Sequence, residues 1–433
     1  MRNSHQKSIG NFITGFLVHI HPRTLPKETL RFSLSLGLGG MAATLLGILF
    51  FTGLLQLFTY APDSKNAYVS IQQMYTHTSL GGWIRNIHYW AGNLLVIVTC
   101  AHLFRVFLTG AVRGERRLNW LIGLSLLFLV LFANFSGYLL PWDQLAYWAV
   151  TIFTGMLAYI PLIGPWLMQL LRGGTDVGAA SLSNFYAIHI ALIPAALCIF
   201  NIWHFWLVRK ASGLVRTDST DGSVADRVPS VPDLVKREAG VGLTLVAFLL
   251  FFSSLVDAPL ADPANPAMSP NPAKAAWYFL GLQELLLHLS PSIAICVVPL
   301  LVVIILASLP FWRDAILPGG IWFGSRNGWK LGLYAFISGG VFTVAAVLFD
   351  DMLLRGTQKN GPVADLLMRG ILPLTAYILA ILTALSLLAR RTGRSRSETV
   401  MAGMLFHLAV LICLTATGIW FRGAGMRLVW PWG

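Results

Sequence analysis

The chain has 433 residues, of which 56% are hydrophobic and only 11% are charged, and its mean hydropathy is +0.68. This composition excludes an ordinary water-soluble enzyme and predicts an all-α, polytopic membrane helix bundle. The net charge of +13 does not indicate a nucleic-acid partner, because the basic residues are distributed among the segments between apolar stretches.

Nine apolar stretches are long enough to form membrane-crossing helices. In chain order they cover 33–59, 88–110, 119–140, 186–208, 240–257, 292–312, 331–349, 371–390 and 401–421. Residues 1–215 therefore hold four helices, a polar cytoplasmic linker follows over 216–239, and five helices occupy 240–433. An apolar stripe between Ile9 and Ile20 predicts an amphipathic helix on the membrane surface before the first span.

The distribution of Lys and Arg predicts the orientation of the bundle. With the N-terminus in the cytoplasm, 22 of the 31 basic residues fall in cytoplasmic segments and 9 fall on the opposite side. This is the positive-inside bias of membrane proteins. It places His88 and His189 near the outer side of the membrane, and His102 and His204 near the cytoplasmic side.

Those four histidines occur at nearly equal spacing on two predicted helices. His102 follows His88 at position i+14, and His204 follows His189 at position i+15. At about 100° and 1.5 Å per residue, each spacing returns to the same helix face roughly 21 Å along the axis. Two such helices, antiparallel and facing, pair His88 with His189 and His102 with His204. Paired neutral imidazoles are axial ligands of haem iron, so the pattern predicts two stacked haems.

Glycines repeat at the interval of His88 and His102 on two helices that carry no histidine. Gly53 follows Gly39 at position i+14, and Gly137 follows Gly123 at the same interval. A glycine inside a helix costs about 1 kcal/mol relative to alanine. The close approach of a flat macrocycle at each haem level would explain that cost, and ordinary small-residue helix packing is the alternative for any one glycine. The other intramembrane histidines, His288 and His407, are single and are expected to be structural or solvated.

At this point several motifs resemble the cytochrome b family, the membrane core of quinol:cytochrome c oxidoreductases and their photosynthetic relatives. The motifs are GGWIRNIH, SGYLLPWDQ, LSNFYAIH, HFWLVRKASG and DPANPAMSPNPAKAAWYFLGLQELL. PWDQ and the i+15 histidine spacing are closest to the split photosynthetic form, here fused to its second-half subunit. The resemblance implies a four-helix di-haem core, about five further helices and a quinone that is menaquinone or ubiquinone. It also implies iron–sulfur (Rieske-type) or c-type cytochrome partners, a homodimer of complexes among membrane lipids, and a bacterial cytoplasmic membrane.

Two departures from the family pattern matter for chemistry. The family's PEWY tetrad reads Ala275, Ala276, Trp277 and Tyr278 here, so the glutamate implied to accept a quinol proton is missing. Gly37 stands where the photosynthetic branch has a cysteine that holds an extra haem. Since no C-x-x-C-H occurs either, both haems are expected to be non-covalent.

The resemblance also implies a quinone site near the outer haem. An apolar pocket with polar groups at its ends suits a quinone, and an interfacial aromatic belt is the alternative explanation for the aromatic residues. The residues expected to form this site are Tyr138, Pro141, Trp142, Tyr147, Trp277 and Tyr278. Glu284 is the first candidate for the missing proton acceptor and Asp143 the second. Alternatively, Glu284 forms a salt bridge or faces solvent, and Asp143 is held by bonds within its loop.

Haem propionates in a low-dielectric bilayer need cationic partners, and arginine is always charged. Arg85 is placed for the outer haem and Arg105 for the inner one, although Arg105 would also suit an interface anchor. The sequence leaves three functions open. The chain is a quinol-oxidising di-haem subunit, a haem-bearing anchor that only relays electrons to a partner, or a transporter with polar intramembrane residues.

Overall fold

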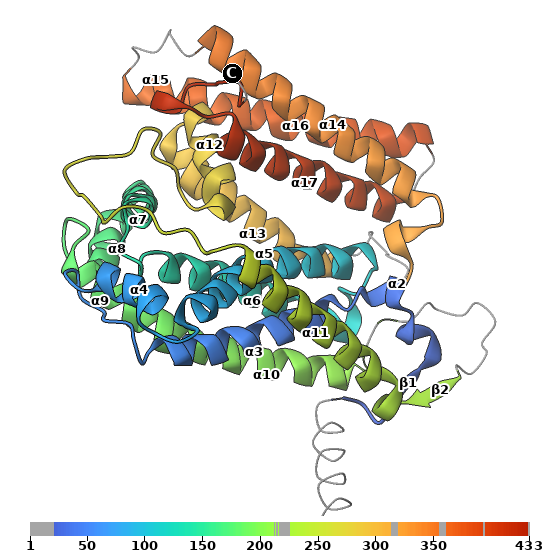
Figure 1. Ribbon diagram of the computed structural model, residues 1–433. Coiled ribbons are helices and arrows are strands. Elements are labelled where there is room, and N and C mark those ends of the chain that lie inside the picture. The colour runs from blue at the N-terminus through green and yellow to red at the C-terminus, as the bar shows by residue number, and fades with distance from the viewer. Residues whose placement is uncertain are drawn as a thin grey trace, which may run out of the picture.

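The computed structural model describes residues 21–211, 213, 215, 226–312, 319–354, 361–392 and 395–431 and is built almost entirely of helices (Figure 1). Within these ranges, nine helices are long and apolar enough to cross a membrane. The predicted all-α, polytopic class is therefore confirmed. The amphipathic stripe between Ile9 and Ile20 lies outside the described residues.

Four long helices form the core that carries the paired histidines. They are α3 (Leu38–Gln56), α5 (Gly81–Leu108), α6 (Arg117–Tyr138) and α10 (Ile193–Lys210). Helix α5 packs against both α3 and α6, and α10 packs against α6. Leu45, Ala91, Val130 and Leu197 belong to one buried apolar cluster that joins all four helices. These helices are apolar on nearly every face because they meet either each other or the membrane.

The fourth helix of the core contains a π turn. Helix α9 (Ala179–Ala187) passes through the π turn η3 (Ile188–Leu192) into α10, and Pro194 follows at the start of α10. Proline lacks the N–H that an uninterrupted α-helix would need there, and a π turn accommodates one extra residue. The π turn therefore explains why His189 and His204 face the same side of their helix although His204 lies at i+15, one residue more than the i+14 interval from His88 to His102 on α5.

Short elements close the two ends of the core. At one end lie α4 (Ala67–Thr76), α7 (Gln144–Leu157) and α8 (Gly164–Arg172). The other end has η1 (Lys27–Leu30), α2 (Phe32–Ser35) and η2 (Gly114–Arg116), and an antiparallel pair of strands, β1 (Thr24–Pro26) and β2 (Arg227–Pro229), with Leu25 opposite Val228.

The fifth spanning helix, α11 (Ser230–Leu255), begins ten residues before the position predicted from hydropathy. The charged turns at its start extend the helix beyond its apolar part, and Arg237 there donates to the carbonyl of Leu30 over 2.6 Å. This long-range contact stabilises a segment that sequence composition assigned to the linker over 216–239. Helix α11 therefore takes in residues 230–239, the last part of the predicted linker.

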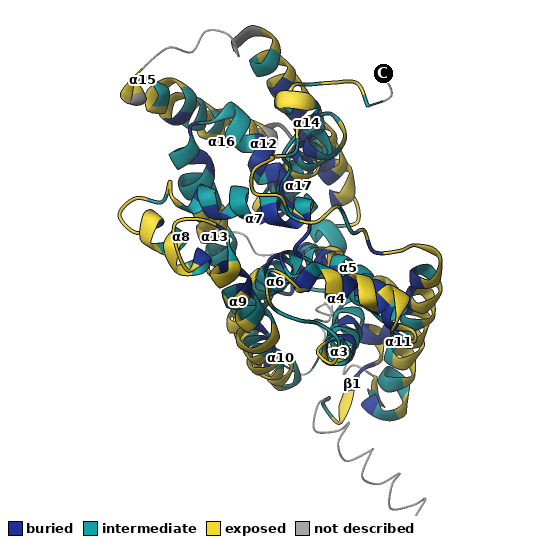
Figure 2. Cartoon of the chain, turned by 60° about the vertical axis from the view of Figure 1, so that its left-hand side comes forward, coloured by how far each residue is buried: buried dark blue, intermediate teal, exposed yellow. Residues whose placement is uncertain are grey.

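The helices from α12 to α17 form a group beside the core (Figure 1), whereas α11 packs against α5 and α3 of the core. Helix α14 packs along α17, and α12 also packs against α17. Figure 2 shows the outward faces of the long helices as exposed, as expected for lipid-facing surfaces. The elements are η4 (Trp277–Phe279), α12 (Leu280–His288), η5 (Ile293–Val297), α13 (Val298–Ser308), η6 (Leu309–Phe311), η7 (Trp322–Gly324), α14 (Gly328–Phe349), η8 (Asp350–Leu354), α15 (Pro362–Leu366), η9 (Leu367–Ile371), α16 (Leu372–Thr392), α17 (Arg396–Trp420) and η10 (Ala424–Met426).

Candidate haem levels and quinone site

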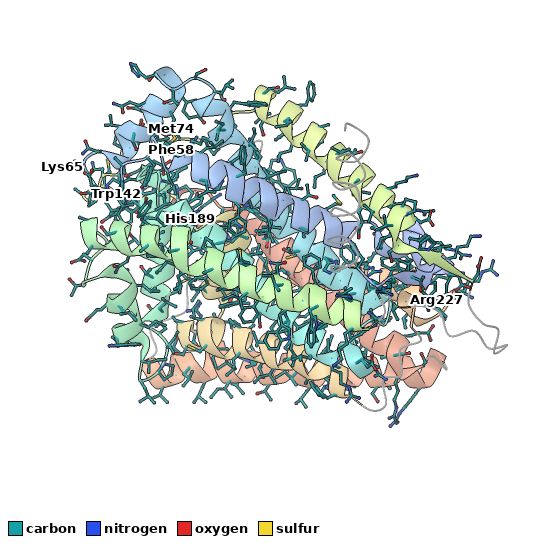
Figure 3. The ribbon with its side chains drawn as sticks, turned by 90° about the horizontal axis from the view of Figure 1, so that it is seen from below. Phe58, Lys65, Met74, Trp142, His189 and Arg227 are labelled. Carbon is teal, nitrogen blue, oxygen red and sulfur yellow. The ribbon has the colours of Figure 1, made fainter. Side chains whose placement is uncertain are left out.

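The structure brings the four histidines together as two cross-helix pairs. The ring centres of His88 and His189 lie 6.3 Å apart, and those of His102 and His204 lie 6.5 Å apart. A metal held by two imidazole nitrogens at about 2 Å each needs a ring-centre separation of about 6 Å. Each pair therefore has the spacing that two imidazoles would need to hold one iron between them. Figure 3 places His189 inside the bundle.

Each of the four glycines faces one of the four histidines. A Cβ atom added at Gly53 would lie 3.3 Å from His88, and one added at Gly137 would lie 2.6 Å from His189. At the other level, the corresponding distances are 3.4 Å from Gly39 to His102 and 3.6 Å from Gly123 to His204. The interval shared by the two glycine pairs thus places two glycines beside each histidine pair. We call these sets the His88–His189 level and the His102–His204 level.

The two arginines predicted to bind propionates have different surroundings. Arg85 donates to the hydroxyl of Tyr75 over 2.6 Å and to the carbonyls of Ala258 and Pro259 over 2.9 Å each. Arg105 donates from Nε to the carbonyl of Leu34 over 2.7 Å, while its buried Nη2 has no partner among the described residues. A buried cationic donor without a partner is costly, so Arg105 fits an anionic group such as a haem propionate.

Two hydroxyl side chains contact the histidines, and the sequence analysis did not single them out. Thr52 Oγ1 lies 2.9 Å from Nδ1 of His88, and Ser136 Oγ lies 3.1 Å from Nδ1 of His189. Each hydroxyl residue directly precedes a glycine of the same level. That adjacency is the sequence signal that could have identified them.

Two motifs that are far apart in sequence meet beside the His88–His189 level. Asp143 caps α7 by accepting from the backbone of Ala146 over 2.8 Å, and it also accepts from the backbone of Ala261 over 3.0 Å. Gln144 exchanges hydrogen bonds with Asn265 and Met268. The PWDQ loop and the segment before the altered tetrad are therefore one structural unit.

Most residues predicted to form the quinone site gather around this unit. Trp142 and Tyr147 belong to one buried apolar cluster, against which Tyr278 packs. Trp277 lies beside Tyr278, with 5.6 Å between ring centres, and donates to Asn93 over 2.5 Å. The buried Tyr278 hydroxyl has no partner among the described residues. An unpaired buried hydroxyl fits a site that receives a polar ligand atom.

Comparison with known proteins shows similarity over the first half of the chain. Residues 27–212 match the family described as Cytochrome b/b6/petB. The cytochrome b6 of Synechococcus sp. (strain CC9902) is 40% identical over 173 residues, which cover 40% of this chain and 79% of that protein. The cytochrome b6 of Synechococcus elongatus is 39% identical over 173 residues, with 40% and 80% covered.

The chain belongs to the cytochrome b/b6 family. The fold of the whole chain is similar to a solved structure titled "Hyperthermophilic respiratory Complex III", with a TM-score of 0.64, 20% identity and 92% of each chain covered. Family membership implies b-type haem and quinone binding and a role as a membrane oxidoreductase subunit in electron transport. The resemblance found in the sequence is thereby confirmed.

The structure describes both positions at which the sequence analysis noted a departure from the family pattern. Gly37 adopts φ +64°, and a Cβ atom there would lie 2.9 Å from Val241, so a larger residue would be strained. In the altered tetrad, Ala275 donates its backbone N–H to Gln283 over 2.7 Å, and Gln283 donates to the carbonyl of Ala273 over 2.9 Å. The segment therefore keeps a defined backbone although Ala276 lacks a carboxylate.

Glu284 lies in a buried ion network, which was the alternative to its role as proton acceptor. Arg422 binds both carboxylate oxygens of Glu284 and also pairs with Asp351 over 2.6 Å. His288 bridges Glu284 at 3.2 Å and Asp350 at 2.7 Å. We call these five residues the terminal ion network.

The network changes the proton affinity of its members. Burial by itself raises the pKa of Glu284, but hydrogen bonds from His288 and Arg422 outweigh burial and lower it. Burial lowers the pKa of His288, but bonds to Asp350 and Glu284 raise it to about 8. Burial raises the pKa of Asp143 above its usual range, despite backbone hydrogen bonds from Ala146 and Ala261 that lower it. The preference for Glu284 over Asp143 as a base is therefore not supported by the contacts of Glu284.

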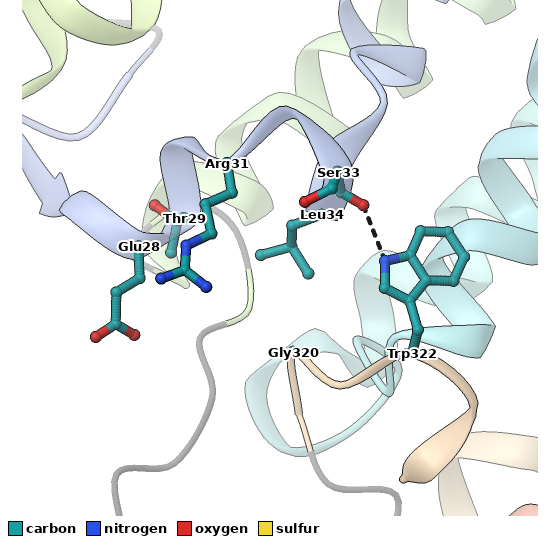
Figure 4. A pocket seen from close by; sticks show the side chains of 7 residues that line it. All are labelled: Glu28, Thr29, Arg31, Ser33, Leu34, Gly320 and Trp322. Atoms are coloured by element: carbon teal, nitrogen blue, oxygen red, sulfur yellow. Dashed lines mark hydrogen bonds between the residues drawn. The ribbon is translucent and has the colours of Figure 1, made fainter. Parts of the chain in front are cut away.

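A small cavity lies at the opposite end of the core, near the His102–His204 level. It has a volume of about 200 Å³ and lies between the α2 region and Trp322, which donates to the carbonyl of Ser33 over 2.9 Å (Figure 4). Glu28 and Arg31 line its polar side. This lining does not resemble the largely apolar wall expected of a quinone site.

Proposed function

We propose that this cytochrome b carries electrons across the membrane through two non-covalent b-type haems and exchanges them with a quinone pool. The observation that supports this most directly is the pair of histidine levels. Each level has two imidazoles about 6.3–6.5 Å apart, with two glycines facing them. In this proposal His88 and His189 hold one haem, and His102 and His204 hold the other.

A bound b-type haem supplies one-electron redox chemistry. The chain supports that chemistry by holding both levels on one helix, at positions i and i+14, which lie roughly 21 Å apart along α5. This distance covers much of the hydrocarbon thickness of about 30 Å. Arg105 would neutralise a propionate at the His102–His204 level. Arg85 would contribute its remaining N–H groups at the other level, since three of its bonds go to Tyr75, Ala258 and Pro259.

The quinone site of the proposal adjoins the His88–His189 level. Its apolar wall would consist of Tyr138, Pro141, Trp142, Tyr147 and Trp277, and the Tyr278 hydroxyl would bond a quinone oxygen. Asp143 is the favoured proton acceptor, because its oxygens accept neutral backbone hydrogen bonds from Ala146 and Ala261 whereas Glu284 is bound by an arginine, and because burial raises the pKa of Asp143. Glu284 remains the second candidate.

The family suggests a wider setting for the proposal. We propose a respiratory bc-type complex in a bacterial cytoplasmic membrane, with the N-terminus in the cytoplasm and the His88–His189 level near the outer side. Rieske-type iron–sulfur and c-type cytochrome subunits would accept electrons, the quinone would be menaquinone or ubiquinone, and the complex would be a dimer among lipids. Similarity of fold to the respiratory Complex III structure supports this setting.

The alternative function is a haem-bearing anchor that relays electrons between the quinone pool and a partner without a full Q-cycle. Purified complex should contain two b-type haems per chain, all extractable with acidic acetone, and a quinone-analogue inhibitor should block haem reduction by quinol. Haems that are still reduced at full rate with the inhibitor bound would contradict the quinone site. A haem-stained band at the mass of this chain on a denaturing gel would contradict non-covalent binding.

Substitution of the two carboxylates distinguishes the proton acceptors. Asp143→Asn keeps a residue type that caps helices well and removes the titrating group. If Asp143 is the base, we expect haem reduction by quinol to slow by about 10²-fold or more. Glu284→Gln should leave the pH profile of the reaction unchanged. The reverse result would assign the role to Glu284.

A further inference from the structure

The two histidine levels differ in what binds Nδ1 of each ring. At the His88–His189 level, both Nδ1 atoms have hydrogen-bond partners within 3.1 Å. At the other level, Nδ1 of His102 and Nδ1 of His204 are buried and neither has a hydroxyl partner in the described part of the chain, although the backbone of Asn119 approaches His204. The sequence carries the same asymmetry. The glycines of the first level follow Thr52 and Ser136, whereas those of the second follow Leu38 and Ile122.

The bonds at the His88–His189 level determine which ring nitrogen carries the proton. Thr52 donates its single hydroxyl proton to the carbonyl of Ile48 over 2.7 Å, so its oxygen must accept from Nδ1 of His88. Nδ1 of His189 lies 3.0 Å from the carbonyl of Ala133, which can only accept. Both rings are therefore protonated at Nδ1, and the Nε2 lone pair of each is left for iron.

We propose that Thr52 and Ser136 are positioning residues that fix the tautomer and orientation of His88 and His189 and thereby lower the reduction potential of the haem at this level. The inference rests on the proposed haem ligation. A hydrogen bond from Nδ1–H to an acceptor makes the imidazole a stronger electron donor. Stronger donation stabilises oxidised iron, which has the higher charge, and so lowers the potential.

The test measures both haem potentials by redox potentiometry of the intact complex carrying Thr52→Val or Ser136→Ala. Outer-shell partners of metal ligands typically contribute 10–100-fold. We expect each variant to favour reduction of this haem by about tenfold, which for one electron raises its potential by about 59 mV. The potential of the His102–His204 haem should not change. Thr52→Ser keeps the hydroxyl and should restore the original potential.

Two variants on the same helices provide matched controls. Thr44 and Ser125 also bond helix carbonyls, those of Gly40 and Leu121, and in the described part of the chain no hydrogen bond joins either of them to a histidine pair. Thr44→Val and Ser125→Ala should therefore leave both potentials unchanged. The low-spin electron paramagnetic resonance signal of the haem at the His88–His189 level should shift in Thr52→Val, because it depends on the angle between the two ligand rings, which is 76°.

The outcomes separate this inference from the proposed function. If the parent complex lacks two b-type haems, the proposed ligation fails. If both haems are present and Thr52→Val and Ser136→Ala leave their potentials unchanged, or shift both equally, only this inference fails. Selective loss of one haem in Thr52→Val, with both haems kept in Thr44→Val and Thr52→Ser, supports it, because ligand orientation contributes to affinity.

Discussion

Polar side chains have different surroundings in the haem core and in the terminal ion network. In the core, four histidines lie in two pairs with glycines beside them, and several polar atoms have no partner within the described ranges. In the network, Glu284 and Arg422 are fully buried and paired with each other. In a membrane protein, buried polar groups without a protein partner indicate a place for a ligand, whereas buried ion pairs indicate a contact that holds helices together. The following predictions test that distinction.

The largest effect is expected from a histidine of the core. His102→Leu should remove the haem of the His102–His204 level completely and leave the other haem spectrally intact, because each haem depends on its own pair. Optical spectra and pyridine haemochrome assays would measure the loss. His407→Leu is the control, since His407 is single and bonds the carbonyl of Gly403. Two haems in His102→Leu would refute the pairing.

Breaking the terminal ion network should destabilise the fold without changing the haems. Arg422→Gln leaves the buried Glu284 without its main partner, and breaking such a pair costs about 3–5 kcal/mol. Thermal unfolding of the detergent-solubilised complex would show a lower midpoint with both haem spectra unchanged. Arg427→Gln, at an exposed position, is the control and should unfold like the parent protein. An Arg422→Gln variant as stable as the parent would mean that the network does not hold the helices together.

A methyl group at one core glycine should affect one haem level only. In Gly137→Ala the new Cβ would lie 2.6 Å from His189, so the ring must shift. Overpacking of this kind costs about 1–3 kcal/mol, and we expect weaker haem retention at the His88–His189 level. In Gly47→Ala, on α3, the Cβ meets no described atom within 4 Å, and both haems should be retained. Equal retention in the two variants would leave the glycine interval without a role in haem binding.

The smallest effect is a pH dependence of stability that originates in the network. The pKa of His288 is raised from 6.5 to about 8, so its contribution of about 2 kcal/mol at most is present below pH 6.5. It is lost as the pH rises through about 8. The lowered pKa of Glu284 has the opposite sign, since its contribution is present above pH 4.5 and is lost in acid.

Thermal midpoints measured from about pH 6 to pH 9 should therefore fall across this range in the parent protein. His288→Asn should flatten that slope, because the titrating ring is gone. A slope that persists unchanged in His288→Asn would assign the pH dependence to another group.

The sequence by itself determined the fold class, the number of spanning helices and the places of the candidate haem levels. These features are periodic or compositional. Hydropathy marks helices that a membrane must enclose, and the interval shared by His88, His102 and the glycine pairs returns to one helix face. The helix edges were less accurate, as at Ser230, because contacts such as that of Arg237 with Leu30 extend a helix beyond its apolar part.

Only the tertiary structure decided which groups pair across the fold. Glu284 and Arg422 are 138 residues apart, and Asp143 meets Ala261 across 118 residues. No periodicity relates such positions, so sequence could name Glu284 as a candidate base but could not reveal the arginine that binds its carboxylate. The same holds for Thr52 and His88, 36 residues apart on different helices. Helical repeats specify which face a residue occupies, whereas the packing of helices specifies what that face contacts.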